Sequence, residues 1–343
     1  MTTVNPIIET RGLTKNYGHV AALRGLDLTV GSGEVHGFLG PNGAGKSTTL
    51  RILLGLVRSS GGTARVLNKD PWSDSVALHK EIAYVPGDVS LWPGLTGGET
   101  IDLLTHLRGG ADRRLLRSLT DDFQFDPRTR ARSYSKGNRQ KVALIAALAR
   151  PADLYLFDEP TSGLDPVMES VFRNQVQRIK AEGGTILLSS HILSEVEQLC
   201  DIVTIIRAGT TVESGTLDGM RHLSRTSYDV RGPGVGTALA AALGQRGGEG
   251  IHNLVTTDDA AEFDVDVERV PEVLTALSRL PVTGLTVSPP SLESIFLRHY
   301  GAEGEAGGGA AGEVAGDAGG HAGRTQGAAR DGSSDPSERE VAR

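Results

Sequence analysis

A glycine-rich run lies between the apolar segment Val35–Leu39 and a second apolar segment with helical spacing. Glycines let successive main-chain N–H groups turn toward phosphate oxygens, and the N-terminus of the following helix adds positive potential. In this pattern Lys46 is expected to reach the β- and γ-phosphates of a nucleotide, and Ser47 to place its hydroxyl on Mg²⁺. The run therefore predicts a nucleotide-binding loop. It consists of Gly40, Pro41, Asn42, Gly43, Ala44, Gly45, Lys46, Ser47 and Thr48.

The phosphate-binding loop does not by itself select the nucleotide base. A GTP-binding protein would need an Asn-Lys-x-Asp motif to read guanine. The segment Asn68-Lys69-Asp70-Pro71 comes close to that motif but lacks the spacer residue. We therefore interpret this segment as a turn.

Two adjacent carboxylates, Asp158 and Glu159, end the apolar run Leu154–Phe157. α/β sheets bind their ligands at the carboxyl ends of the strands. There Asp158 is suited to a contact with Mg²⁺ through water, and Glu159 to orienting or deprotonating an attacking water. Since this pair follows a phosphate-binding loop, we expect the bound nucleotide to be hydrolysed.

A third polar segment, Tyr134–Lys141, immediately precedes a helical pattern. Ser135 and Gly137 at a helix N-terminus would form a second anion-binding device. An ordinary helix cap is the alternative, because a serine followed three residues later by Asn138 also caps a helix. Taken alone, these residues favour the cap.

The elements that must position these residues alternate between short apolar runs and helical patterns over residues 5–220, as in an α/β sheet protein. The expected strands are Leu26–Val30, Val35–Leu39, Ile82–Val85, Leu154–Phe157, Thr185–Ser189 and Ile202–Ile206. The expected helices are Lys46–Leu56, Glu99–Leu107, Asn138–Ala149, Met168–Ala181 and Ile192–Leu199. Cys200 closes an apolar pattern with core spacing on the last helix, so we assign it no chemical role.

Residues 221–300 form a second block, in which the expected order β, α, β, β, α, β suggests a small α+β, ferredoxin-like unit followed by a helix at Ser291–Tyr300. Residues 301–343 contain no Leu, Ile, Phe, Tyr or Trp, and 22 of these 43 residues are Gly or Ala. Such a tail cannot bury enough apolar surface to order itself, so we expect it to be disordered and without a binding role. The predicted division is therefore 1–220, 221–300 and 301–343.

The composition narrows the class of protein further. A chain of 343 residues suggests about two domains plus a remainder. The net charge of −7 argues against a dedicated nucleic-acid binder. A single cysteine excludes an internal disulfide and a multi-cysteine zinc site, and it suits a reducing cytoplasm. Neither an apolar run of 18 residues nor a basic and apolar leader occurs, so we expect no membrane span and no signal peptide.

The combined motifs resemble the ATP-binding subunit of ATP-binding-cassette (ABC) transporters over about residues 7–220. They occur in the order of that family, as GPNGAGKST, YSKGN, LYLFDEPTSGLDP and Ser189-Ser190-His191. The resemblance implies the P-loop NTPase fold, ATP and Mg²⁺ as ligands, and a homodimer that shares its two sites. Each site takes its phosphate loop and carboxylates from one copy and its signature segment from the other.

The resemblance also implies roles for single residues. Tyr17 matches the aromatic residue that stacks on adenine, an interaction worth roughly 1–3 kcal/mol per base. Ser135 and Gly137 match the signature segment that contacts the γ-phosphate held by the other copy. Asp165 matches the loop that bridges the two copies. His191 matches the switch histidine that senses the γ-phosphate.

Two motifs depart from the family pattern. Gly87 stands where the family usually has a Mg²⁺-linked glutamine, and Asp88, one place on, is an uncertain substitute. In the signature segment, Tyr134, Lys136 and Asn138 replace the common Leu, Gly and Gln. Since Lys46, Asp158, Glu159 and His191 are all present, the resemblance still implies active hydrolysis.

The resemblance further implies that the chain acts together with a membrane protein. Such a chain needs a separate permease, which we expect to dock on Val89–Pro93, with Trp92 as an exposed anchor or as an ordinary core residue. The second block, ending Ser291–Gly301, resembles daunorubicin-resistance-type exporter ATPases, which favours export of a drug or another amphipathic molecule from the cytoplasmic face of the cell membrane. The alternatives are a soluble ABC ATPase acting on ribosomes or DNA, and a regulatory cassette that does not hydrolyse ATP.

Overall fold

The computed structural model describes residues 6–222, 225–243 and 250–288. The predicted helix at Ser291–Tyr300 and the predicted disordered tail, 301–343, lie outside these residues.

The predicted site belongs to a mostly parallel sheet within residues 6–222. Its strands are β3 (Val35–Leu39), β5 (Ile82–Val85), β6 (Leu154–Asp158), β7 (Thr185–Ser190), β8 (Ile202–Arg207) and β9 (Thr210–Thr216). Their order is β5-β6-β7-β3-β8-β9, and only the β8–β9 pair in this sheet of the described residues is antiparallel. Strands β3, β6 and β7 are buried at every position, which explains why they read as continuous apolar runs.

A second sheet, formed by three strands of the same segment 6–222, was only partly predicted. Its strands are β1 (Ile8–Tyr17), β2 (Val20–Val30) and β4 (Gly61–Val66), paired antiparallel in the order β2-β1-β4. The sequence predicted only the end of β2, at Leu26–Val30. The turn at Asn68-Lys69-Asp70-Pro71 follows β4, and Asn68 has a left-handed backbone with φ 63°. The interpretation of that segment as a turn is therefore confirmed.

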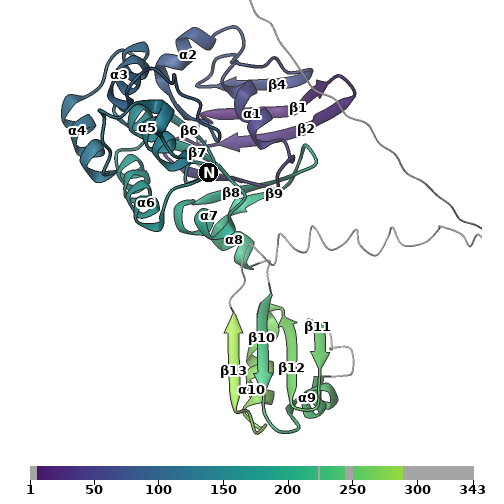
Figure 1. Ribbon diagram of the computed structural model, residues 1–343. Coiled ribbons are helices and arrows are strands. Elements are labelled where there is room, and N and C mark those ends of the chain that lie inside the picture. Colours follow the sequence, from purple (N-terminus) through teal and green to yellow (C-terminus); the bar gives the residue numbers. More distant parts are fainter. Residues whose placement is uncertain (1–5, 223–224, 244–249, 289–343) are drawn as a thin grey trace, which may run out of the picture. The chain divides into compact units, whose positions relative to one another are not determined.

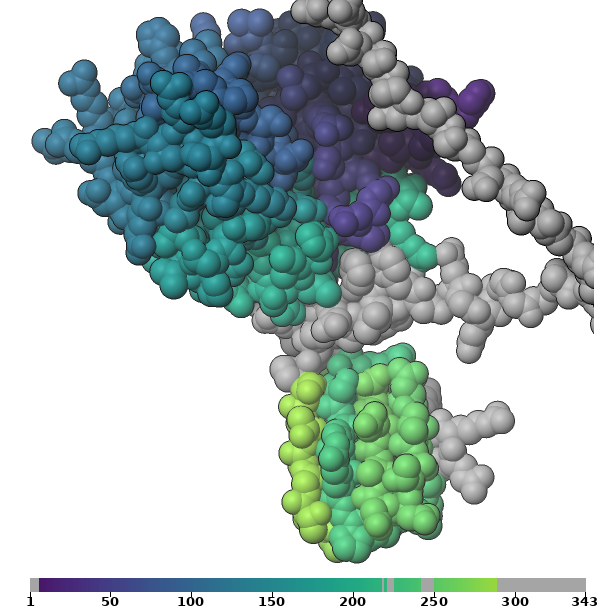
Figure 2. Space-filling view, viewed as in Figure 1, coloured from purple at the N-terminus to yellow at the C-terminus, as the bar shows by residue number. Residues whose placement is uncertain are grey.

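Helices cover the parallel sheet. They are α1 (Lys46–Leu53), α2 (Ser75–Glu81), α3 (Gly97–Leu107), α4 (Arg113–Asp122), α5 (Lys136–Leu148), α6 (Pro166–Ala181), α7 (Leu193–Leu199) and α8 (Leu217–His222). Figure 1 shows α3, α4 and α5 grouped on the side away from β1, β2 and β4. In the space-filling view the side chains of this helical group form a lobe of the surface (Figure 2). Helices α2, α4 and α8 were not predicted.

Side chains from alternating positions of the parallel sheet enter two apolar clusters. Phe157 of β6 packs edge-to-face on Phe172 of α6, with ring centroids 5.5 Å apart. Leu156, its neighbour on the strand, belongs to the second cluster with β1, β2 and α1. Cys200 is buried in the first cluster, as its spacing predicted, and burial raises the pKa of its thiol.

Residues 225–243 and 250–288 form a separate antiparallel sheet with its own apolar cluster. Its elements are β10 (Thr226–Arg231), α9 (Val235–Leu243), β11 (Ile251–Thr256), β12 (Ala260–Val265), α10 (Val270–Leu277) and β13 (Gly284–Ser288). The strands follow the order β11-β12-β10-β13, and Tyr228 stacks on Phe263 at 5.3 Å. The element order β, α, β, β, α, β agrees with the sequence expectation, while the ferredoxin-like class and the domain boundaries stay predictions.

Candidate nucleotide-binding site

The phosphate-binding loop joins β3 to α1 and needs glycine for two different reasons. At Gly40 an added Cβ would lie 2.4 Å from the carbonyl oxygen of Ile206, so the loop packs too closely on β8 for a side chain. At Gly45 the backbone is left-handed, with φ 113°. This residue is also the N-cap of α1, and no side chain caps the helix. The first N–H groups of α1 are therefore available to an anion.

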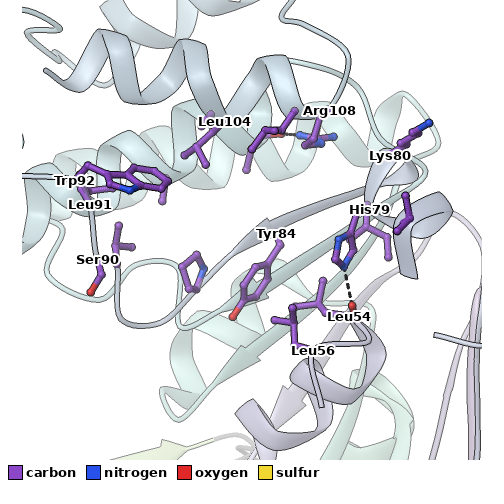
Figure 3. Close-up of a pocket in the computed structure, with 18 residues that line it drawn as sticks. Leu54, Leu56, His79, Lys80, Tyr84, Ser90, Leu91, Trp92, Leu104 and Arg108 are labelled. Atoms are coloured by element: carbon purple, nitrogen blue, oxygen red, sulfur yellow. Dashed lines mark hydrogen bonds between the residues drawn. The ribbon is translucent and has the colours of Figure 1, made fainter. Parts of the chain in front are cut away.

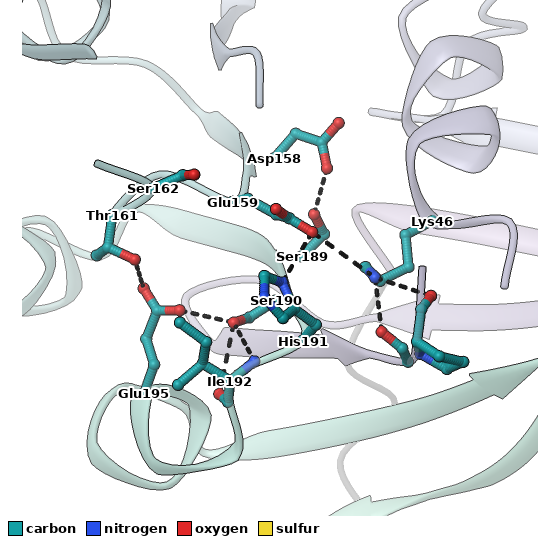
Figure 4. A network of polar contacts seen from close by, with 12 residues as sticks. Lys46, Asp158, Glu159, Thr161, Ser162, Ser189, Ser190, His191, Ile192 and Glu195 are labelled. Atoms are coloured by element: carbon teal, nitrogen blue, oxygen red, sulfur yellow. Dashed lines mark hydrogen bonds and ion pairs between the residues drawn. The ribbon is translucent and has the colours of Figure 1, made fainter. Parts of the chain in front are cut away.

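Lys46 opens α1 and folds back over the loop. Its Nζ donates to the carbonyl oxygens of Gly40 at 2.6 Å and Pro41 at 3.1 Å, and lies 3.9 Å from Glu159 Oε1 (Figure 4). The side chain is only 5% exposed, and this burial lowers the pKa of the ammonium, while Glu159 and Asp158 act in the opposite direction. The cation thus lies where it can exchange loop carbonyls for phosphate oxygens.

Asp158 lies at the carboxyl end of β6, beside Ser189 of β7. Ser189 Oγ donates to Asp158 Oδ1 at 2.5 Å, and the two residues are partners in the parallel register. Among the described residues, no hydrogen-bond donor contacts the other oxygen of Asp158, which suits a metal-bound water. No group of three or more His, Cys, Asp or Glu residues that could hold a metal occurs in the described chain. A Mg²⁺ ion would depend on Asp158, Ser47 and nucleotide phosphates, which is how Mg²⁺ is usually held in ATPase sites.

Glu159 follows directly and has an unusual backbone. Its φ is +47°, a left-handed conformation that costs a residue with a side chain about 1–3 kcal/mol. Its N–H donates to the carbonyl oxygen of Ser189 at 3.0 Å, and its Oε1 lies 3.0 Å from His191 Nδ1. The carboxylate therefore lies between the imidazole of His191 and the ammonium of Lys46. Such strain is concentrated where surrounding contacts hold a functional residue in place.

The structure brings together Lys46, Asp158, Glu159 and His191, at the adjacent carboxyl ends of β3, β6 and β7. Tyr17 ends β1, is 42% exposed, and has the Nζ of Lys15 4.9 Å from its ring centroid. An exposed ring of this kind is open to stacking by a base.

The signature segment and Asp165 contact other parts of the fold. Ser135 is the N-cap of α5, as its local sequence favoured, and its Oγ accepts from Asn138 N at 3.3 Å. Asp165 is the N-cap of α6. At Gly137 an added Cβ would lie 2.5 Å from the carbonyl oxygen of Gly163. Among the described residues, Ser135 and Asp165 make no hydrogen bond or ion pair with Lys46, Asp158, Glu159 or His191.

Sequence reasoning missed several polar residues around Glu159. The motif Ser189-Ser190-His191 predicts a role for the histidine but none for the two serines. Glu195 accepts hydrogen bonds from Ser190 and Thr161. Gln140 is 1% exposed, and its Nε2 donates to the carbonyl oxygen of Pro160 at 2.9 Å. Gln140 could have been found as a polar residue inside the apolar helical pattern Asn138–Ala149, whereas no local signal marks Glu195.

Gly87 lies against Asp158. An added Cβ at this position would be 3.2 Å from the main-chain oxygen of Asp158 and 3.6 Å from its Cγ. Asp88 is exposed. Gly87, which stands where the family usually has glutamine, thus lets the main chain of its loop approach the end of β6 closely.

A groove of about 590 Å³ is lined in part by Pro86 and Val89, which flank Gly87 and Asp88 in the sequence, and Figure 3 shows its labelled lining residues. Its wall is mostly apolar and includes Val89, Leu91, Trp92 and Leu104. Trp92 is 50% exposed, so it is not a packed core residue. The walls come from Leu54, Leu56, Val76, His79, Lys80, Ile82, Tyr84, Pro86, Val89, Ser90, Leu91, Trp92, Leu104, Leu107, Arg108, Ala143, Ala146 and Ala147.

Two polar side chains of this groove are strongly desolvated. Burial and the nearby charge of Asp158 raise the pKa of Tyr84 to about 12. Arg108 donates through one terminal nitrogen to the carbonyl oxygen of Ala147 at 2.9 Å. Its Nε and other terminal nitrogen are buried without a hydrogen-bond partner among the described residues, and burial lowers the pKa of the guanidinium.

The parallel sheet, the glycine loop that opens α1 and the two carboxylates at the end of β6 define a P-loop nucleotide-binding cassette. Within the described residues, no helix is both long and apolar enough to traverse a bilayer.

Known proteins match the part of the chain that carries this site. The ABC transporter family model matches residues 23–162. The daunorubicin/doxorubicin resistance ATP-binding protein DrrA of Streptomyces peucetius is 39% identical over 214 residues, which cover 61% of this chain and 65% of that protein. A fluoroquinolones export ATP-binding protein of Mycobacterium tuberculosis is 36% identical over 240 residues, covering 68% of this chain and 80% of that protein. A solved ATP-binding subunit of an ABC transporter is 31% identical with a TM-score of 0.60, covering 63% of this chain and 92% of that one.

The chain belongs to the ATP-binding proteins of the ABC transporter family. The resemblance stated from the motifs and the P-loop NTPase fold are thereby confirmed. The chain spans slightly less than two thirds of the length of DrrA.

Proposed function

We propose that this chain binds ATP with Mg²⁺, hydrolyses it as a homodimer, and powers a separate membrane permease from the cytoplasmic face of the cell membrane. The observation that carries the proposal is the position of the Glu159 carboxylate, between Lys46 and His191 and directly after Asp158. A phosphate loop, a cation, a metal-binding carboxylate and a second carboxylate are the groups that phosphoryl transfer to water requires.

In the proposed reaction, the free N–H groups of α1 bind the β-phosphate and Lys46 leaves its loop carbonyls for the β- and γ-phosphates. Bound Mg²⁺ would neutralise the charge that develops on the phosphate oxygens. Glu159 orients the attacking water and accepts its proton, and His191 contacts the γ-phosphate while it fixes the Glu159 carboxylate. Tyr17 stacks on the adenine.

Dimerisation completes the site in this proposal. Ser135 and Gly137 at the start of α5 would close over the nucleotide bound to the other copy, and Asp165 would lie at the contact between the copies. The position of Ser135 at the start of α5 supports this role, because its side chain caps only the N–H of Asn138 and leaves the N–H groups of Lys136 and Gly137 for an anion. ATP would hold the two copies together, and hydrolysis would remove that bridge.

The groove beside Trp92 supports the permease part of the proposal. A half-exposed tryptophan in an apolar wall is the type of residue that anchors a protein partner. The unpartnered donors of Arg108 would bind a carboxylate or a helix-end carbonyl of the docked segment, because leaving them buried and unpaired is costly. The relatives named for drug resistance and export support a drug or similar amphipathic molecule as the cargo.

Purification of the full chain from its own cells, followed by a phosphate-release assay with and without Mg²⁺, tests this function. We expect a membrane protein to co-purify and Mg²⁺-dependent ATP turnover to be measurable. Co-purification of ribosomes or DNA instead would favour the soluble ABC ATPase. Tight ATP binding without turnover would favour the regulatory cassette, the alternative that Gly87 supports.

A further inference from the structure

Glu195 of α7 contacts two loops that flank the proposed catalytic carboxylate. Its Oε1 accepts from Thr161 Oγ1 at 2.9 Å, and its Oε2 accepts from Ser190 Oγ at 2.6 Å (Figure 4). Thr161 lies two residues after Glu159, and Ser190 lies immediately before His191. One carboxylate therefore links the segment that follows Glu159 to the segment that carries His191.

The linked segments are the ones whose backbone sets the Glu159–His191 contact. Ser190 Oγ also accepts from Ile192 N at 2.9 Å, so the hydroxyl bound by Glu195 organises the main chain on both sides of His191. On the other segment, Ser162 N donates to the carbonyl oxygen of Glu159 at 3.1 Å and closes a turn around Thr161. Displacing either hydroxyl would move the backbone that aims Glu159 or His191.

The left-handed backbone of Glu159 makes such support necessary. A conformation that costs about 1–3 kcal/mol persists only where neighbouring contacts hold it. Gln140 holds the carbonyl of Pro160 from α5, and Glu195 holds Thr161 from α7. The two contacts fix the chain immediately after Glu159 from two different helices.

The surroundings of Glu195 exclude a simple surface role. Glu195 lines a small cavity of about 80 Å³ together with Glu169 and Arg173. Its burial raises the pKa of its carboxyl, whereas the hydrogen bonds from Ser190 and Thr161 act in the opposite direction. A carboxylate is costly in such a position unless hydroxyl donors satisfy it.

We propose that Glu195 is a positioning residue for ATP hydrolysis, which holds Glu159 and His191 in their mutual geometry through Thr161 and Ser190. The proposal rests on the function proposed above. Glu195 touches neither the phosphate-binding loop nor Lys46 among the described residues, so its effect is on the catalytic step and not on nucleotide binding.

The test compares steady-state ATP turnover and ATP binding in full-length variants. Glu195→Ala removes both acceptors, and we expect kcat to fall on the order of 10²-fold, as a displacement of about 1 Å can cause. KM and the Kd for ATP should change by less than threefold. Glu195→Gln keeps the shape of the side chain and one acceptor oxygen. Its amide NH₂ can donate to the second hydroxyl once that hydroxyl rotates, so both contacts persist and most of kcat should be recovered. Glu169→Ala, which removes a carboxylate from the same cavity but not the link, is the matched control.

Two further variants keep the proposal testable if Glu195→Ala does not fold. Thr161→Val and Ser190→Ala each remove one donor, and each should lower kcat with ATP affinity unchanged. Two results would overturn the positioning role alone, provided that the wild type turns over ATP. One is an unaltered kcat in Glu195→Ala, and the other is an equal loss of kcat and of ATP affinity in all variants. A wild-type chain that binds ATP without turning it over would overturn the proposed function first and this role with it.

Discussion

The imidazole Nδ1 of His191 lies 3.0 Å from Oε1 of Glu159, although the two residues follow different strands, β7 and β6, and lie 32 positions apart. The contact pairs the group proposed to activate water with the group proposed to sense the γ-phosphate. Any movement of His191 toward a phosphate would alter the position of the base as well.

Glu159→Gln should abolish most ATP turnover, by about 10²–10⁴-fold, because an amide cannot accept the proton of the attacking water. ATP binding should persist, and the variant should accumulate as a dimer that light scattering detects. Glu182→Gln, at an exposed position after α6, is the control and should behave like the wild type. Turnover within twofold of the wild type would remove Glu159 from its role.

Lys46→Ala should weaken ATP binding because the loop loses its buried cation. A hydrogen bond to a charged group contributes about 1.5–3 kcal/mol, which corresponds to roughly a 10- to 150-fold rise in Kd. Titration calorimetry with ATP measures the change. Lys69→Ala, which removes a lysine paired with Glu81 at the surface, should leave Kd unaltered, and equal affinities of the two variants would contradict the assignment.

The stability difference between the wild type and Glu195→Gln should depend on pH. Burial raises the folded-state pKa of the Glu195 carboxyl, so the folded protein binds more protons than the unfolded chain between the unfolded and folded pKa values. Wild-type stability therefore falls as pH rises through this window, and the neutral glutamine lacks that slope. Melting temperatures are measured for both proteins from pH 4 to 8, roughly the range around and above the reference pKa of glutamate. The melting temperature of Glu195→Gln should rise relative to that of the wild type as the pH increases. If the variant instead became relatively more stable as the pH falls, the folded-state pKa of Glu195 would be lowered and not raised.

The charges that act on Glu195 sharpen this prediction. Glu169 raises its pKa further, while His191 lowers it. Glu169→Ala should therefore flatten the pH dependence without breaking the hydrogen bonds from Thr161 and Ser190.

Trp92→Ala should release the permease. A buried tryptophan anchor at an interface typically contributes about 2 kcal/mol or more, so its loss should raise the Kd for the permease by at least roughly 30-fold. The permease should then no longer co-purify with the chain. The basal ATP turnover of the free chain should be unaffected. Trp72 is also 50% exposed but lies outside the groove, and Trp72→Ala should retain the permease. Equal retention by both variants would exclude the groove as the docking site.

Gly87→Ala should raise the Mg²⁺ concentration needed for half-maximal turnover, by about threefold or more, because misplacing a metal ligand slightly is costly. The added Cβ would lie 3.2 Å from the main-chain oxygen of Asp158, so the backbone that carries the proposed metal carboxylate would have to shift. At Gly94 an added Cβ meets nothing within 4 Å, so Gly94→Ala is the control. An unchanged Mg²⁺ dependence in both would show that Asp158 tolerates the contact.

The parallel sheet could be predicted from the sequence because strands buried on both faces read as uninterrupted apolar runs, such as Leu154–Phe157. Strand β1 could not be predicted in this way. Its buried positions are Ile8, Thr10 and Leu13, and a register shift beside Gly12 breaks the two-residue alternation. The pattern that normally identifies a half-buried strand is therefore absent.

The same contrast applies to the site. The phosphate loop and the Asp158–Glu159 pair are contiguous, so local spacing was enough to predict them. Glu195 was missed because Thr161 and Ser190 reach it from two loops that only the folded sheet brings together. Its position on α7 looked like that of any polar residue on a half-exposed helix.

Cys200 has a practical consequence for work on this molecule. It is the only cysteine in the chain, it lies in the apolar core, and burial keeps its thiol protonated. Reagents such as maleimides attack the thiolate, so the native protein should resist labelling. A single cysteine engineered at an exposed position would then carry a fluorophore or spin label selectively, and the native residue would need no replacement before distances between two copies are followed during turnover.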